Sequence, residues 1–190
     1  MPSSTSIPTG NGELEVPGAP DVIWLNGAFG VGKTTVAELL LERIEGAAVV
    51  DPELVGTLLR VLLPSDWQTA DFQDMPLWRS LTREAIGGLV TAGRVPLVIP
   101  MTVVRPDYLD ELVGALRRGG IDVRHFTLLA PAATILSRLV GRDDYDTPWA
   151  RDRVVECVGA LADPRFAEHI DADARDPREI VADVVERLTV

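Results

Sequence analysis

Residues 22–35 read VIWLNGAFGVGKTT, an apolar run that leads into a glycine-rich turn, a lysine and two threonines. The run at 22–25 shows no polar alternation, which is typical of a strand buried on both faces of a sheet. The turn from Gly27 to Thr34 fits the pattern G-x-x-x-x-G-K-[ST], the P-loop signature. Beyond it, apolar residues recur at helical spacing as far as Gly46. The stretch therefore predicts a strand, a phosphate-binding turn and a helix in succession.

Each residue type in this turn suits nucleotide binding. Glycines let successive backbone N–H groups point at phosphates, and the helix that follows adds the positive end of its dipole. We expect Lys33 to reach the β- and γ-phosphates as a catalytic cation and the Thr34 hydroxyl to ligate Mg²⁺. Lys33 is also the only lysine among 18 basic residues, all the others being arginine. The residues expected to bind ATP are Gly27, Ala28, Phe29, Gly30, Val31, Gly32, Lys33, Thr34 and Thr35.

Strand and helix patterns alternate along the rest of the chain. Apolar runs predict strands at 22–25, 47–50, 95–99, 123–129 and 168–170. This alternation implies right-handed crossovers and a parallel sheet covered on both faces. The predicted fold class is α/β, a three-layer P-loop NTPase fold with a mostly parallel five-stranded sheet. We expect a flexible N-terminal tail at 1–20 and a single P-loop kinase-like domain at 21–190, with a small lid at about 139–150.

Composition narrows the range of partners. The formal net charge is -11 and the pI is near 4.6, and an acidic surface repels phosphate backbones and anionic lipid headgroups. We therefore expect a small-molecule substrate and neither a nucleic-acid nor a membrane partner, in a monomer or a homodimer. One cysteine, Cys157, and the absence of a signal-peptide pattern at the start favour the cytoplasm.

Asp51 ends the second predicted strand, and ligands of parallel sheets bind beyond the carboxyl ends of the strands. A carboxylate there can accept a proton from an attacking hydroxyl, contact the substrate, or help to hold Mg²⁺. It can equally cap the helix that begins at Pro52. The third strand runs into Pro100-Met101-Thr102 without a carboxylate, which disfavours a motor or a GTPase switch and places more weight on Asp51.

Arg138 and Arg142 lie four residues apart, and therefore on one helical face if the helix extends that far. They lead into the polar segment 141–148. Arginines on such segments commonly close over a transferring phosphoryl group, so both are candidate catalytic residues. The alternative is that they pair with the acids at 143, 144 and 146.

Aromatic residues are concentrated between Trp67 and Trp78, with Arg79 beside them. This group could line an apolar pocket with one cation, suited to a flat or greasy substrate. It could also be a small core under a loop. The residues expected at the substrate are Asp51, Phe72, Trp78, Arg79 and Met101.

Several segments resemble one known family, the ATP-binding tunicamycin-resistance proteins, which are similar in fold to nucleotide and shikimate kinases. The resemblance rests on 23–34, 51–53, FQ with PLWR in 71–79, PMT at 100–102, HFTL at 125–128, and short matches from Arg138 to Ile170. It implies ATP with Mg²⁺ as cofactor and resistance to a nucleoside antibiotic with a fatty tail. The segment 143–148 departs from the family pattern, which affects the identity of the acceptor rather than nucleotide binding.

Three functional hypotheses follow. The first is an ATP-dependent kinase of a small hydroxylated molecule such as tunicamycin or a related nucleoside compound. The second is a protein that binds ATP and sequesters the antibiotic without phosphorylating it. The third is a general nucleotide or metabolite kinase, which the sequence does not separate from the first.

Overall fold

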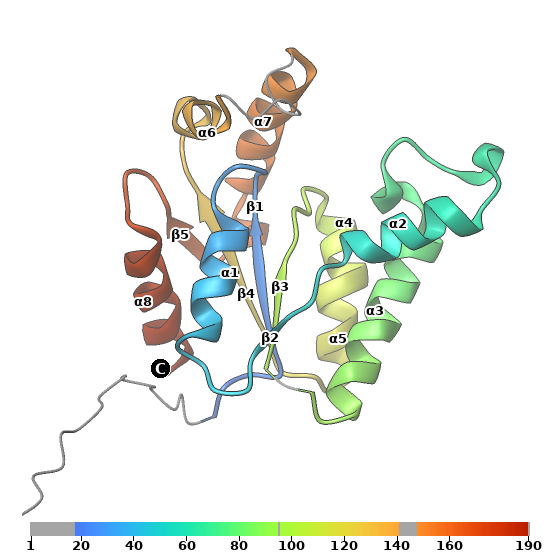
Figure 1. Ribbon diagram of the computed structural model, residues 1–190, viewed down its shortest axis with the longest axis horizontal. Coiled ribbons are helices and arrows are strands. Elements are labelled where there is room, and N and C mark those ends of the chain that lie inside the picture. Colours follow the sequence, from blue (N-terminus) through green and yellow to red (C-terminus); the bar gives the residue numbers. More distant parts are fainter. Residues whose placement is uncertain (1–17, 95, 141–147, 190) are drawn as a thin grey trace, which may run out of the picture.

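The computed structural model describes residues 18–94, 96–140 and 148–189, which form one sheet with helices packed around it (Figure 1). Every strand pairing in this part of the chain is parallel, and the strand order is β2-β3-β1-β4-β5. The strands are β1 (Val22–Gly27), β2 (Ala48–Val49), β3 (Leu97–Pro100), β4 (Val123–Leu129) and β5 (His169–Asp171). The predicted α/β fold with a parallel five-stranded sheet is confirmed.

Helices follow the strands in alternation. They are α1 (Lys33–Leu41), α2 (Glu53–Leu62), α3 (Pro76–Thr91), α4 (Pro106–Leu109), α5 (Ala115–Arg118), α6 (Ala132–Leu139), α7 (Pro148–Leu161) and α8 (Pro177–Leu188). A π-helical turn, η3 (Asp110–Gly114), joins α4 to α5, so 106–118 is one helical segment. Short 3₁₀ turns lie at η1 (Ser65–Trp67), η2 (Phe72–Asp74) and η4 (Pro164–Phe166). Among the described residues, no helix is both long and apolar enough to span a bilayer.

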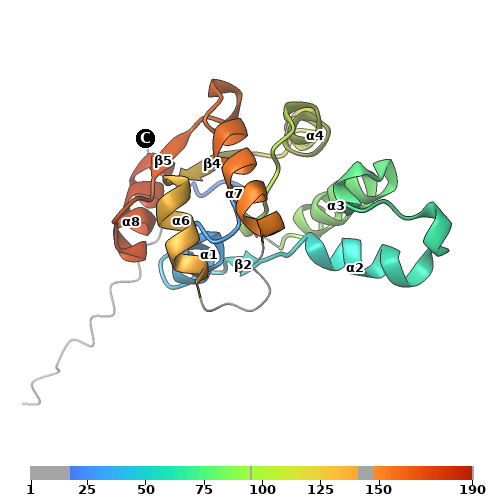
Figure 2. The ribbon, with the colours of Figure 1, turned by 90° about the horizontal axis from the view of Figure 1, so that it is seen from above.

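The helices cover both faces of the sheet. Helices α1 and α8 pack together on one face, and α3, α4 and α5 lie on the other (Figure 1). The turn after β1, the start of α2 and helix α7 gather at the edge where the parallel strands end. Viewed from above that edge, α7 lies near the middle of the molecule, and α2 lies towards one side, next to α3 (Figure 2).

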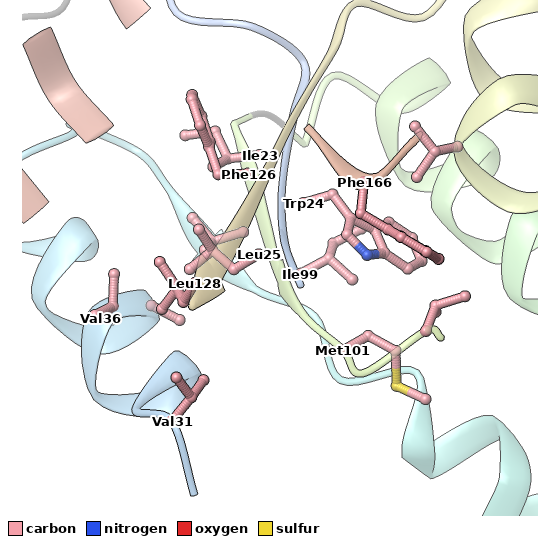
Figure 3. Packing of buried hydrophobic residues seen from close by; sticks show 14 of the residues in the cluster. Ile23, Trp24, Leu25, Val31, Val36, Ile99, Met101, Phe126, Leu128 and Phe166 are labelled. Atoms are coloured by element: carbon pink, nitrogen blue, oxygen red, sulfur yellow. The ribbon is translucent and has the colours of Figure 1, made fainter. Parts of the chain in front are cut away.

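Strand β1 lies in the middle of the sheet, and its residues 22–25 are completely buried. Figure 3 shows Ile23 and Leu25 directed to the side of α1, whereas Trp24 is directed to the opposite side, with Ile99 and Phe166. An alternating strand with one wet face would carry polar residues at every second position. Burial on both faces therefore explains the unbroken apolar run that begins the P-loop stretch.

The wall formed by α2 and η2 depends on a close approach at Gly56. A Cβ built on Gly56 would lie 2.7 Å from the Phe72 ring, and that ring already packs on Trp78 with centroids 5.0 Å apart. Gly88 in α3 has no atom within 4 Å of a Cβ built in the same way. The two glycines are thus a matched pair for testing the packing of this wall.

We expect Gly56→Ala to lower the free energy of unfolding by about 1–3 kcal/mol, because the new methyl group would push the Phe72 ring out of its packing on Trp78. Gly88→Ala should instead raise it by about 0.5–1 kcal/mol, since alanine is the better helix former at an open site. Urea unfolding of both variants measures the difference. Equal effects of the two substitutions would contradict the close contact with Phe72.

Candidate functional site

The turn between β1 and α1 has the backbone of a phosphate cradle. Gly32, immediately before α1, has φ +113°, and a Cβ on Gly27 would lie 2.9 Å from the Leu128 carbonyl oxygen. Helix α1 has no side-chain cap and no acidic residue in its first turn. Its first N–H groups have no partner within the helix, and they carry the positive end of the helix dipole. The cradle therefore fits an anionic phosphate group.

Lys33 lies folded onto this turn. Its Nζ donates to the Gly27 carbonyl at 2.8 Å, to the Ala28 carbonyl at 3.0 Å and to Thr102 Oγ1 at 2.8 Å. Burial of the ammonium lowers its pKa from 10.5 to about 8, and the nearby carboxylate of Glu53 partly opposes that shift. All three ammonium protons are thus used by oxygens of the protein, and a β- or γ-phosphate would compete for them.

A cleft of about 730 Å³ opens beside the P-loop. Its lining comes from Phe29, from α2, from residues 70–74, from the segment 101–108 and from α7. Two of the predicted substrate residues, Phe72 and Met101, are part of this lining. Asp51 is exposed at the start of α2, where its Oδ1 accepts the backbone N–H of Glu53 at 2.9 Å, so it caps the helix as one interpretation predicted.

Glu53 is the site residue that the sequence analysis missed. Its side chain lines the cleft, and its pKa is raised by burial and then by repulsion from Asp51, while the charge of Lys33 opposes the rise. The available signal was an acid one turn beyond the end of the second strand. Asp51 was the stronger candidate in the sequence because it ends the strand, but in the structure the side chain of Glu53, in the first turn of α2, lines the cleft.

Trp78 and Arg79, two of the predicted substrate residues, lie outside the lining of the cleft. Trp78 is fully buried, and its Nε1 donates to the Pro52 carbonyl at 3.1 Å. Arg79 is almost fully buried; its Nε pairs with Glu111 at 2.6 Å, and its guanidinium stacks on the Tyr108 ring at 4.1 Å. Neither residue lines the cleft. Trp78 is part of the hydrophobic core.

Arg138, in α6, forms a hydrogen bond to the P-loop. Its Nη1 donates to the Val31 carbonyl and its Nη2 to the Ala172 carbonyl, both at 3.0 Å. Its guanidinium therefore links the P-loop to the segment after β5. Arg142, the second predicted arginine, lies outside the described residues, as do residues 141–147 of the predicted lid.

Comparisons with known proteins agree with this architecture. A family model described as an AAA domain matches residues 22–160. The chain belongs to this AAA-domain family. A solved tunicamycin resistance protein from Deinococcus radiodurans is 29% identical to this AAA-domain chain, with a TM-score of 0.74, over 89% of this chain and 96% of that one. No curated protein sequence matched.

Two further solved structures share the fold with this AAA-domain chain. A gluconokinase from Sinorhizobium meliloti 1021 is 20% identical, with a TM-score of 0.64, over 89% of this chain and 91% of that one. A shikimate kinase from Bacteroides thetaiotaomicron is 18% identical, with a TM-score of 0.59, over 90% of this chain and 100% of that one. The chain is thus a P-loop domain of kinase-like architecture.

The depressed pKa of Lys33 predicts a pH dependence for nucleotide binding. Below about pH 7.5 the free protein carries the ammonium, so affinity for ATP with Mg²⁺ should be nearly constant. Above pH 8 the ammonium is increasingly lost, and binding must be coupled to proton uptake, so affinity should fall by up to about tenfold per pH unit. Calorimetric titrations between pH 7.5 and pH 10 measure this slope.

Lys33→Met is the control for that titration. It removes the titrating group, so its affinity should be weak and flat over the same pH range. A wild-type affinity that stays constant to pH 10 would contradict the partly neutral lysine.

Proposed function

We propose that this chain is an ATP- and Mg²⁺-dependent phosphotransferase that acts on a hydroxyl group of a small molecule. The observation that carries the proposal is a P-loop, with its lysine folded onto it, beside a cleft that is lined by a carboxylate. Glu53 lines the cleft, and its charge interacts with that of Lys33. Phosphoryl transfer to a hydroxyl requires a cation that binds the phosphates and a group that accepts the hydroxyl proton.

The P-loop would bind the triphosphate through the backbone amides of residues 27–35 and the ammonium of Lys33. The Thr34 side chain is exposed at the start of α1 and would be the protein's ligand to Mg²⁺. Among the described residues, no three acidic, histidine or cysteine side chains lie close enough to hold a metal by themselves. ATP bound with Mg²⁺ would supply the γ-phosphoryl group. Arg138 would keep the cradle in shape, and Arg142 would close over the transferring group.

Glu53 would accept the proton of the attacking hydroxyl. Its raised pKa makes it a better base than an ordinary exposed glutamate, because a base is most effective when its pKa lies nearer to the working pH. Asp51 is the second candidate for this role and also contributes through repulsion, since its charge is one cause of the raised pKa. Phe72 and Met101 would offer the acceptor an apolar surface.

The charges of the cleft favour an acceptor without anionic groups. Its described lining contains five carboxylates, Glu53, Asp71, Asp74, Asp152 and Glu156, against three arginines, Arg60, Arg105 and Arg153. Arg153 is paired with Asp71 at 3.4 Å and with Glu156 at 2.9 Å, and Arg105 is paired with Asp107 at 2.6 Å. A carboxylate or phosphate on the acceptor would therefore meet mainly like charge.

A neutral nucleoside compound such as tunicamycin suits such a cleft better than a nucleotide monophosphate or a sugar acid does. The similarity to the Deinococcus radiodurans tunicamycin resistance protein supports this choice of acceptor. The runner-up is a protein that binds ATP and sequesters the antibiotic. The observation in its favour is the end of β3, where Met101 and Thr102 stand and no carboxylate follows.

Glu53→Gln separates these two functions. We expect it to lower phosphoryl transfer to tunicamycin by about 10²–10⁴-fold while leaving ATP affinity nearly unchanged, because it removes the base and not the cradle. Transfer of labelled phosphate and calorimetry give the two readings. Asp51→Asn should cost less, since asparagine still accepts the helix-capping bond.

The matched control is Glu84→Gln, on an exposed side chain of α3. It should leave transfer unchanged. If Glu53→Gln retained full transfer, the assignment of the base would be wrong. Resistance of cells that survives this substitution, together with no transfer by the wild type, would favour sequestration.

A further inference from the structure

The Thr102 hydroxyl connects the lysine to the P-loop. It accepts a hydrogen bond from Lys33 Nζ at 2.8 Å and donates one to the Gly27 carbonyl, also at 2.8 Å. Thr102 follows β3, the strand beside β1, and thus stands close to where a carboxylate would be sought after that strand. The three oxygens that hold the ammonium, two carbonyls and this hydroxyl, are all uncharged.

Thr102 is itself held from the opposite wall of the cleft. Gln73 Nε2 donates to the Thr102 carbonyl at 3.0 Å, and both residues line the cleft. The backbone N–H of Gln73 is bonded to Asp71 Oδ1 at 2.9 Å, and its carbonyl accepts from the buried guanidinium of Arg79. Arg79 is in turn paired with Glu111. Both backbone polar groups of Gln73 are therefore hydrogen-bonded. The fixed backbone holds the Gln73 side chain where it can bond to Thr102.

We propose that Thr102 is a positioning residue for Lys33 and that Gln73 connects it to the wall that would receive the acceptor. The description of that wall as the acceptor side rests on the proposed function. A carboxylate after β3 would give Lys33 a permanent counter-ion that an incoming phosphate has to displace. A neutral hydroxyl holds the ammonium in place and leaves its charge available.

The hydrogen bond from Gln73 to Thr102 also connects acceptor binding to the position of Lys33. An acceptor seated against residues 71–74 restricts Gln73, and through it the Thr102 peptide and the lysine. Lys33 is then held best when both halves of the cleft are in place. Arg79, which is buried and does not line the cleft, contributes by donating to the Gln73 carbonyl.

The sole lysine of the chain makes this testable without a nucleotide or an acceptor. In protein grown with isotope-labelled lysine, one side-chain signal belongs to Lys33, and its relaxation at pH 7 reports the mobility of the Cε–Nζ group. The free wild type should give a restrained signal. Thr102→Val, which keeps the shape and removes the hydroxyl, should lose that restraint and approach the mobility of free lysine.

Gln73→Met should mobilise the same signal, although Gln73 does not touch Lys33. Two controls keep the lysine restrained: Thr102→Ser, which retains a hydroxyl, and Gln68→Met, the same replacement at a glutamine bonded to the Arg60 and Leu63 carbonyls instead. The double variant Thr102→Val/Gln73→Met should be no more mobile than Thr102→Val, because both act through one link.

A mobile lysine in the wild type, or an unchanged signal in Thr102→Val, overturns the positioning role. An unchanged signal in Gln73→Met overturns the connection to the acceptor wall. Thermal unfolding shows that each variant is folded, and if Thr102→Val does not fold, Gln73→Met against Gln68→Met decides. Failure of phosphoryl transfer would defeat the proposed function and leave this measurement untouched.

Discussion

Burial of β1 on both faces, in the middle of an all-parallel sheet, is the constraint on which the other features of the molecule depend. Because neighbouring strands run in the same direction, the segments that follow β1, β2 and β3 must emerge at one edge. The P-loop, the Asp51–Glu53 turn and Thr102 come from sequence positions up to 75 residues apart. The parallel sheet thus places the cradle, the acid and the hydroxyl at one edge through its topology.

Local patterns were sufficient for the fold because they coincide with tertiary burial. The continuous run at 22–25 and the strand at 123–129 are buried almost throughout, and both lie where the sequence predicts them. The edge strand β2 is shorter than the predicted 47–50, since it has only one neighbour and its two residues are exposed. The P-loop glycines were predictable for a different reason, because the turn itself requires their backbone angles.

The candidate site was predictable only where it is local. The aromatic stretch between Trp67 and Trp78 allowed a pocket or a core, and the choice depended on the Pro52 carbonyl, 26 residues away, that takes the indole N–H. Arg79 looked like a free cation because its partner, Glu111, lies 32 residues further on. Glu53 was missed because the direction of a side chain in the first turn of α2 depends on how that helix packs. The partners of Trp78 and Arg79 lie 26 and 32 residues away along the chain, and a single sequence does not reveal such contacts.

The electrostatics of the cleft explain why a threonine is suitable at the end of β3. The chain carries a net charge of -11, and five carboxylates against three arginines line the described part of the cleft, so a polyanion approaches a mainly acidic surface. At the P-loop, attraction comes from the α1 N-terminus and the ammonium of Lys33. A sixth carboxylate in contact with Lys33 would neutralise that ammonium and add to the repulsion at the point where phosphates must arrive. The hydroxyl of Thr102 supplies the hydrogen bond without the charge, so the small positive site stays positive within an acidic surface.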